Sequence, residues 1–123
     1  MEESRHKTKP LLLRPFIALR VALEGLAAAW RHEVPFRLEV IAVALLGPVG
    51  FFVGKTPVER SLLIGSLLLV LIVELVNSAI ETTVDRVSLG DHPLAKRAKD
   101  IASAAVGLAI ANAALTWLLI VFG

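Results

Sequence analysis

The stretch that decides the fold reads LLIGSLLLVLIV over residues 62–73 and continues as ELVNSAIETTVDR over residues 74–86. The first part is apolar apart from Gly65 and Ser66, whereas the second carries acids, an amide and hydroxyls. On a helix, five polar side chains spaced i, i+3, i+4, i+7 and i+11 share one stripe. They are Glu74, Asn77, Ser78, Glu81 and Asp85. Because an acid at bilayer depth costs about 2.5–3.5 kcal/mol to insert, we interpret this stripe as a functional site facing a protein interior or a wet cleft.

The composition places this stripe in an integral membrane protein. Hydrophobic residues make up 56% of the 123 residues, and the mean hydropathy of +0.74 is far above that of an ordinary globular domain. Cysteine is absent, which excludes disulfides, thiolate metal sites and a cysteine nucleophile. The net charge is only +2, so the basic isoelectric point does not indicate nucleic-acid binding. Chemistry must therefore rest on carboxylates, amides, lysine and arginine.

Three segments approach the length of a membrane span, which is about 20 apolar residues for a hydrocarbon core about 30 Å thick. They run over about residues 35–53, 58–86 and 96–122. Together with a surface helix at about residues 10–33, they predict an all-α membrane protein with a single domain over residues 1–123. The second segment is longer than the bilayer requires, so its acidic C-terminal turns should project into the membrane interface.

The segment before the first span has the pattern of an amphipathic helix that lies in the membrane interface. Its apolar side chains share one face: Leu12, Phe16, Leu19, Leu23, Leu26 and Trp30. Arg14, Arg20 and Glu24 interrupt the apolar stretch, so it is not a signal peptide. A plain anchor with no part in the site is the open alternative for this helix.

Lysine and arginine predict the orientation of the spans. The segment before the first span and the loop between the second and third spans carry most of them, whereas the first loop has only Lys55 and Arg60. By the positive-inside rule, the N-terminus and the second loop are cytoplasmic, and the C-terminus is outside. The polar stripe is therefore expected to open toward cytoplasmic nucleotides.

The third span is interpreted as a packing helix because small residues recur along it and allow backbones to approach closely. They include Ala98, Ala102, Ala105, Ala109 and Ala113. Its first turns place Lys96 and Asp100 at i, i+4 and should hold Lys99 beside the acidic stripe. A cation next to carboxylates is what a nucleotide phosphate and its metal ion require.

The usual phosphotransfer motifs of soluble proteins are missing. The sequence has no G-x-x-x-x-G-K-[ST] loop and no kinase catalytic-loop signature. If ATP is a substrate, it must be bound by a different arrangement.

Three blocks of residues resemble the small prokaryotic diacylglycerol kinases. They are AAWRHEVPFRLE over residues 28–39, ELVNSAIETTVDR over residues 74–86, and RAKD over residues 97–100 followed by Ser103. Their order and spacing cover nearly the whole chain. The resemblance implies a homotrimer of three-span subunits in the prokaryotic inner membrane, each with an N-terminal surface helix. It also implies transfer of phosphate from MgATP to diacylglycerol at the cytoplasmic face.

The same resemblance implies a role for each matching residue. Glu74 corresponds to the general base, and Asn77 to a second catalytic position. Glu33 and Glu81 correspond to the carboxylates that hold Mg²⁺ on the ATP phosphates. The further nucleotide-binding positions are Arg14, Asp91, His92, Lys99 and Asp100. The positions on the lipid side are Arg37 and Ser103, with Glu74 at the lipid hydroxyl.

Other functions stay open at this point. An undecaprenol kinase would use the same scaffold. A small proton-coupled transporter could also use one membrane carboxylate such as Glu74, but it would not explain charged residues gathered at one surface. A non-catalytic membrane scaffold predicts that Glu74→Gln has no effect.

Overall fold

The computed structural model describes residues 10–88 and 90–123, and every regular element within these ranges is a helix. In chain order the elements are η1 (Leu11–Leu13), α2 (Arg14–His32), α3 (Val34–Val53), α4 (Pro57–Val87) and α5 (Pro93–Phe122). Helices α3, α4 and α5 are each long and apolar enough to cross a membrane, which confirms the three predicted spans. The chain divides into two compact units, Met1–Glu33 and Val34–Gly123, and the expected single domain stays a prediction.

The N-terminal unit contains the expected amphipathic helix, α2. Pro15 lies in its first turn, where its fixed φ suits a helix and its missing N–H is not needed. The apolar side chains of Phe16, Leu19 and Leu23 are exposed along the helix. Such a face matches a helix that lies at a membrane surface.

The ends of α4 and α5 follow from local sequence. Both helices begin with a proline at the first position, Pro57 and Pro93. The hydroxyl of Thr56 accepts a hydrogen bond from the backbone N–H of Glu59, and Nδ1 of His92 accepts one from the N–H two residues later. These caps satisfy backbone donors that the first turn of a helix leaves without partners.

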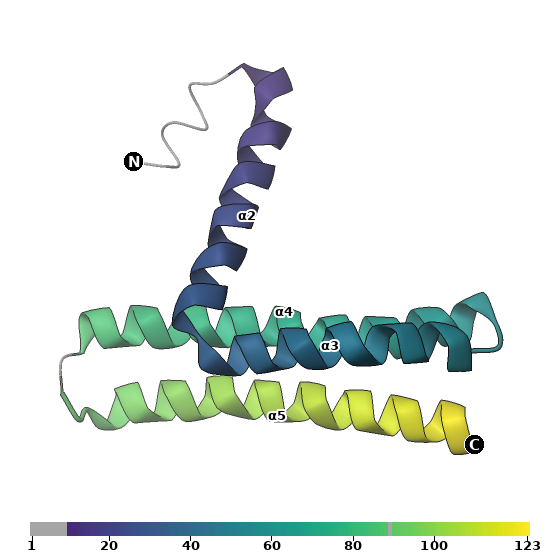
Figure 1. Cartoon of the computed structure of the whole chain (residues 1–123). Helices are drawn as coiled ribbons and strands as arrows, with labels where there is room; N and C mark the ends of the chain where they lie inside the picture. The colour runs from purple at the N-terminus through teal and green to yellow at the C-terminus, as the bar shows by residue number, and fades with distance from the viewer. Residues whose placement is uncertain (1–9, 89) are drawn as a thin grey trace. The chain divides into compact units, whose positions relative to one another are not determined.

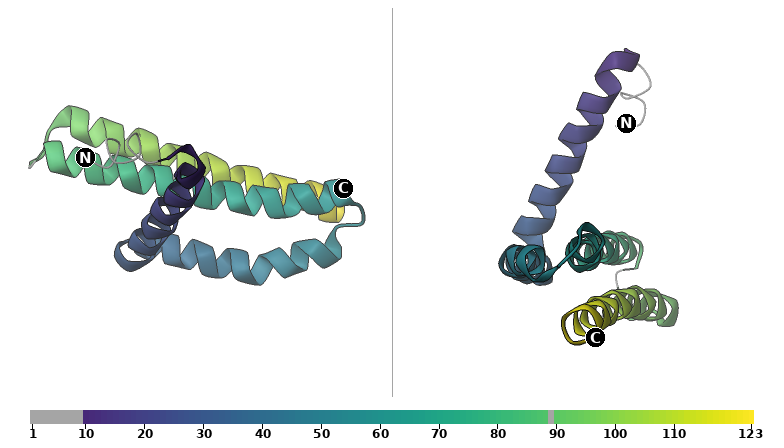
Figure 2. Two further views of the ribbon diagram at one scale, coloured as in Figure 1. Left: turned by 90° about the horizontal axis from the view of Figure 1, so that it is seen from above. Right: turned by 90° about the vertical axis from the view of Figure 1, so that its right-hand side faces the viewer.

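In the unit Val34–Gly123, the three long helices run side by side, and α4 packs against both α3 and α5 (Figures 1 and 2). Helix α4 has 31 residues and α3 has 20. At 1.5 Å per residue, their lengths are about 46 Å and about 30 Å. Because a short turn joins them at one end, the last turns of α4 extend past the start of α3 and lie beside α5 (Figure 1). We call this part of α4, residues 77–87, the overhang.

The apolar half of the bundle is held by small residues and one indole. Ala109 and Ala113 of α5 pack against Val70 of α4. Near the other end, Nε1 of Trp117 donates a hydrogen bond of 3.1 Å to the carbonyl of Leu63, which is fully buried. Gly50 of α3 lies against the same indole, and its lack of a side chain permits this approach. The small residues of α5 therefore act in packing, as the sequence predicts.

Arg60 stabilises the turn between α3 and α4. Its Nε donates hydrogen bonds to the carbonyls of Phe51 and Gly54, at 2.9 and 3.1 Å. The guanidinium also lies over the Phe51 ring, 4.9 Å from its centroid. These contacts satisfy carbonyls at the C-terminal end of α3 and fix the level at which α4 begins.

Candidate active site

The buried stripe of α4 changes from apolar to polar at Glu74. Leu63, Leu67 and Val70 form its apolar part, and the next buried side chain along the same face is Glu74, which is only 4% exposed. Two further polar side chains, Asn77 and Ser78, are each 7% exposed. The helical stripe of polar residues predicted from the sequence is therefore confirmed at its deeper end.

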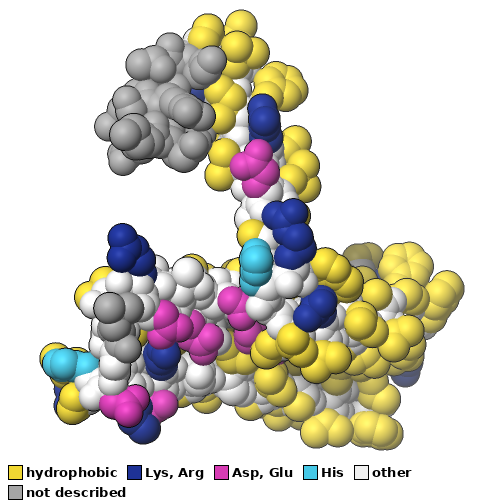
Figure 3. Space-filling model, turned by 60° about the vertical axis from the view of Figure 1, so that its left-hand side comes forward, with side chains coloured by type: hydrophobic (Ala, Val, Ile, Leu, Met, Phe, Trp, Pro, Cys, Tyr) yellow, Lys and Arg dark blue, Asp and Glu magenta, His cyan; other side chains and the backbone are white. Residues whose placement is uncertain are grey.

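The polar part of the stripe continues into the overhang. Glu81 is half-buried and Asp85 is exposed, so burial decreases from Glu74 toward the end of α4. Charged side chains gather on the half of the bundle toward the α4–α5 connection, whereas the other half is mostly apolar (Figure 3). Polar chemistry is thus concentrated where α4 extends past α3.

Asn77 is joined to Glu81 by a hydrogen bond. Its Nδ2 donates to Oε1 of the carboxylate at 3.3 Å, between residues one helical turn apart. The Oδ1 atom of the same amide is buried and has no hydrogen-bond partner within the described residues. Asn77 therefore orients the Glu81 carboxylate and still has an acceptor to offer.

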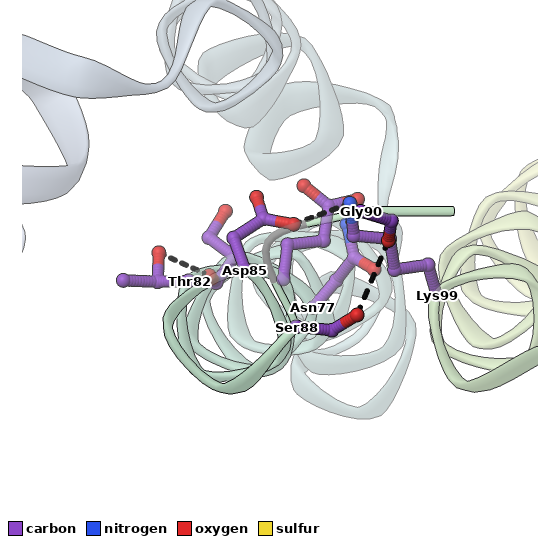
Figure 4. A network of polar contacts seen from close by, with 8 residues as sticks. Asn77, Thr82, Asp85, Ser88, Gly90 and Lys99 are labelled. Carbon is purple, nitrogen blue, oxygen red and sulfur yellow. Dashed lines mark hydrogen bonds and ion pairs between the residues drawn. The ribbon is translucent and has the colours of Figure 1, made fainter. Parts of the chain in front are cut away.

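Lys99 of α5 lies beside the acidic stripe, as the sequence predicts. Its Nζ is 2.5 Å from Oδ1 of Asp85, and its charge also interacts with Glu81 (Figure 4). The Lys99 side chain is only 39% exposed, so its ammonium is held near the overhang. The ion pair connects α4 with α5 and places the Lys99 ammonium near the carboxylates of Asp85 and Glu81.

Two predicted site residues on α5, Asp100 and Ser103, are not bonded to this group. Asp100 forms an i, i+4 ion pair of 2.6 Å with Lys96, and both side chains are largely exposed. Ser103 is also exposed. The Lys96–Asp100 pair agrees with the spacing in the sequence, but within the described residues no hydrogen bond or ion pair joins Asp100 or Ser103 to the stripe on α4.

A pocket of about 640 Å³ opens at the α4–α5 connection, next to the overhang. It is bounded by residues of both helices and of the connection between them: Asp85, Ser88, Gly90, Asp91, His92, Pro93, Ala95, Lys96, Lys99 and Asp100. Asp91, His92 and Asp100 are three of the residues expected at a nucleotide. The Nδ1 atom of His92 already accepts a hydrogen bond at the start of α5, so Nε2 is the ring nitrogen left to meet a ligand.

Glu39 of α3 was not among the site residues expected from the sequence. It is half-buried, its Oε2 atom has no hydrogen-bond partner within the described part of the chain, and its carboxyl group is close enough to Glu74 for the two charges to repel. Arg37, on the same helix, is half-buried as well. An acid inside an apolar span is the signal that could have identified Glu39.

Arg14 and Glu33 belong to the N-terminal unit. Arg14 is the first residue of α2 and is exposed, and Glu33 is the half-buried residue that directly follows the helix. They lie at opposite ends of α2, so that helix holds them about 28 Å apart.

The Glu81 carboxylate is a candidate ligand for a magnesium ion that a nucleotide also binds. Within the described ranges, no group of three or more histidine, cysteine or acidic side chains could hold a metal ion. Mg²⁺ commonly uses one or two carboxylates together with phosphates and water. The oriented carboxylate of Glu81, with Lys99 nearby, fits that requirement.

Comparison with known proteins decides which family has this arrangement. The model of the family described as prokaryotic diacylglycerol kinase matches residues 20–121. The chain belongs to this family. The match covers α2 from Arg20 onward, the whole of α3 and α4, α5 except its last residue, and every site residue discussed above except Arg14.

Similar proteins named diacylglycerol kinase occur in several bacteria. The Pseudomonas aeruginosa protein is 46% identical over 123 residues, which is the whole of both chains. The Escherichia coli protein is 46% identical over 99 residues, covering 80% of this chain and 81% of its own. The Haemophilus influenzae protein is 43% identical over 98 residues, covering 80% of this chain and 83% of its own.

Membership of the diacylglycerol kinase family makes the chain a membrane-bound lipid kinase with a nucleotide as phosphoryl donor. This result confirms the resemblance that rests on the three sequence blocks. It also favours the kinase over the proton-coupled transporter and over the non-catalytic scaffold.

Proposed function

We propose that the chain transfers the γ-phosphoryl group of ATP to the hydroxyl of diacylglycerol, giving phosphatidic acid and ADP at the cytoplasmic face of the inner membrane. The observation that supports this most directly is the burial of Glu74 where the apolar stripe of α4 becomes polar. A lipid hydroxyl reaches that level from the bilayer, and a nucleotide reaches the overhang from water.

Glu74 is proposed as the general base. Its carboxylate accepts the proton of the lipid hydroxyl while that oxygen attacks the γ-phosphorus. The bond from the γ-phosphorus to the oxygen that bridges it to the β-phosphate breaks, and ADP leaves. Phosphoryl transfer depends mainly on positioning and charge stabilisation, so one base and a few charged groups suffice. Asn77, one turn away, keeps the neighbouring carboxylate of Glu81 in place.

Glu33 and Glu81 are proposed to hold Mg²⁺ on the ATP phosphates. Bound Mg²⁺ neutralises charge on the phosphates. Glu81 is suited to this role because Asn77 orients it and because it lies about 10 Å nearer the end of α4 than Glu74. Glu33 belongs to the N-terminal unit. Its role as a metal ligand is proposed from the family resemblance alone.

Lys99 is proposed to bind phosphate oxygens. Its ion pair with Asp85 keeps the ammonium at the overhang, and a phosphate would compete with that carboxylate for it. The pocket at the α4–α5 connection would take the rest of the nucleotide. Asp91, His92 and Asp100 contribute to its lining.

Three further assignments come from the resemblance alone. Arg14 is proposed to contact the nucleotide, and Arg37 and Ser103 to lie on the lipid side.

The N-terminus is proposed to be cytoplasmic and the C-terminus outside, because lysine and arginine gather in the N-terminal segment and in the α4–α5 connection.

The active assembly is proposed to be a homotrimer with sites between subunits. Within one chain, the carboxylates of Glu39 and Glu81 belong to half-buried residues and Asp85 is exposed. Polar groups facing lipid are costly, so a neighbouring subunit that encloses this region would stabilise it.

The test is transfer of labelled phosphate from ATP to diacylglycerol, undecaprenol and ceramide in mixed micelles. Diacylglycerol should be the best acceptor, and the reaction should require Mg²⁺. If undecaprenol is phosphorylated faster, the chain is an undecaprenol kinase on the same scaffold. If none of the three lipids is phosphorylated, the proposed function is wrong.

A further inference from the structure

Ser78 differs from the other hydroxyl side chains on the buried side and polar end of α4. A serine or threonine in a helix commonly donates to a carbonyl three or four residues earlier. Ser66, Thr82 and Thr83 all do so, at 2.8–2.9 Å. Ser78 is 7% exposed, yet its Oγ has no hydrogen-bond partner within the described part of the chain. Its hydroxyl is therefore not used by its own helix.

A buried hydroxyl without a partner destabilises the helix bundle that contains it. An alanine at this position would avoid that cost. The hydroxyl of Ser78 is thus better explained by a partner that comes from outside the chain than by packing.

The surroundings of Ser78 indicate the chemistry of that partner. Within the described residues, two further buried oxygens have no hydrogen-bond partner: Oδ1 of the adjacent residue Asn77, and Oε2 of Glu39, whose carboxyl group interacts with that of Glu74. An amide oxygen accepts hydrogen bonds and does not donate them, and a carboxylate does the same when ionised. Among these three groups, the hydroxyl of Ser78 is the one that always has a proton to donate. A ligand here would need a donor for the carboxylates and an acceptor for Ser78.

Diacylglycerol has these two features on neighbouring carbon atoms. Its hydroxyl is a donor, and the ester carbonyl next to it is an acceptor. Glu74, the proposed base, and Ser78 are four residues apart, so their Cβ atoms are about 5–6 Å apart on one helix face. One glycerol group could therefore meet both side chains.

We propose that the hydroxyl of Ser78 donates a hydrogen bond to the ester carbonyl beside the reacting hydroxyl, and that this contact makes the enzyme prefer glycerol diesters to other lipid alcohols. The proposal rests on the proposed function, because it assumes that Glu74 receives the proton of the lipid hydroxyl. Ser78 is then a specificity-determining residue, and it takes no part in proton transfer.

The experiment compares three lipid alcohols in mixed micelles: a 1,2-diacylglycerol, the matching 1,2-dialkylglycerol and undecaprenol. The dialkylglycerol has ether oxygens in place of ester groups, so it keeps the hydroxyl and the chains but loses both carbonyls. The value of kcat/KM for each lipid is measured at saturating MgATP. The parent should favour the diester over the diether by about three- to tenfold, which is what one hydrogen bond between uncharged groups supplies.

Three variants separate a specificity role from a structural one. In Ser78→Ala the ratio of kcat/KM for diester over diether should fall to near one, mainly through KM for the diester. Ser78→Thr keeps a hydroxyl and should retain most of the preference. Ser66→Ala is the matched control, because Ser66 is equally buried on α4 but its hydroxyl is already bonded to Leu63. It should leave the ratio at the parent value.

Each outcome decides the matter. A parent that uses diester and diether equally well overturns the proposal without any variant, which also covers the case in which Ser78→Ala does not fold. A Ser78→Ala enzyme that loses activity equally toward all three lipids shows that Ser78 only supports packing. A parent that phosphorylates none of the lipids refutes the proposed function, and the role of Ser78 with it.

Discussion

Replacing Glu74 by glutamine keeps the size of a side chain that is only 4% exposed but removes its ability to accept a proton. A general base contributes about 10²- to 10⁴-fold to a rate, so kcat of Glu74→Gln should fall by about that factor. The equivalent rise in the activation barrier is about 2.7–5.4 kcal/mol. Because Glu81 lies seven residues further along α4, about 10 Å away, KM for MgATP should stay within about twofold of the parent.

The assay is the initial rate of labelled phosphate transfer to diacylglycerol, with kcat and both KM values measured in mixed micelles. Glu24→Gln is the control, since Glu24 is an exposed carboxylate paired with Arg20 on α2. Circular dichroism should show unchanged helix content for both variants. A kcat within a few-fold of the parent would refute the role as general base. A rise in KM for MgATP as large as the fall in kcat would instead indicate a nucleotide contact.

Three further predictions concern the metal ligands, the packing of α3 and the assembly of subunits. Glu33→Gln and Glu81→Gln should raise KM for MgATP by about tenfold or more, and raising Mg²⁺ should partly restore activity; an effect on lipid affinity alone would contradict the metal assignment. Gly50→Leu should destabilise the bundle by about 1–3 kcal/mol in a thermal or denaturant unfolding measurement, because a Cβ atom at this position would lie 3.2 Å from the indole of Trp117. Gly47→Leu on the same helix is the control, since a Cβ atom there has nothing within 4 Å. Mixing Glu33→Gln and Lys99→Ala subunits, at an MgATP concentration at which each variant alone has little activity, should restore some activity if these residues reach one site from different chains. Crosslinking of differently tagged subunits must first show mixed oligomers, and mixed oligomers without recovered activity would mean that one chain builds each site.

Much of the fold could be predicted because membrane spans depend on local composition. The apolar runs and their prolines placed α3, α4 and α5 within about three residues of their observed bounds. The helical period likewise put Glu74, Asn77 and Ser78 on one buried face. The Lys96–Asp100 pair follows from i, i+4 spacing.

The remaining features of the site depend on how the helices are aligned. The sequence predicts Lys99 beside the acidic stripe, but its pairing with Asp85 in particular requires the register of α4 against α5, which no local pattern encodes. The closeness of Glu39 to Glu74 depends on the level at which the turn after α3 sets the start of α4. The unused hydroxyl of Ser78 could not be predicted either, since the rotamer of this side chain and the acceptors within its reach are properties of the packed bundle.

The overhang brings together two substrates that are dissolved in different phases. Glu74 lies near the level where α3 begins, and the carboxylates and Lys99 lie further along α4 and α5, beyond that level. A lipid can therefore react without leaving the bilayer, and a nucleotide without entering it. The rate should then depend on the mole fraction of diacylglycerol in the membrane and on the bulk concentration of MgATP. Diluting the lipid with inert detergent at constant total diacylglycerol would slow the enzyme, although no molecule of either substrate had been removed from the sample.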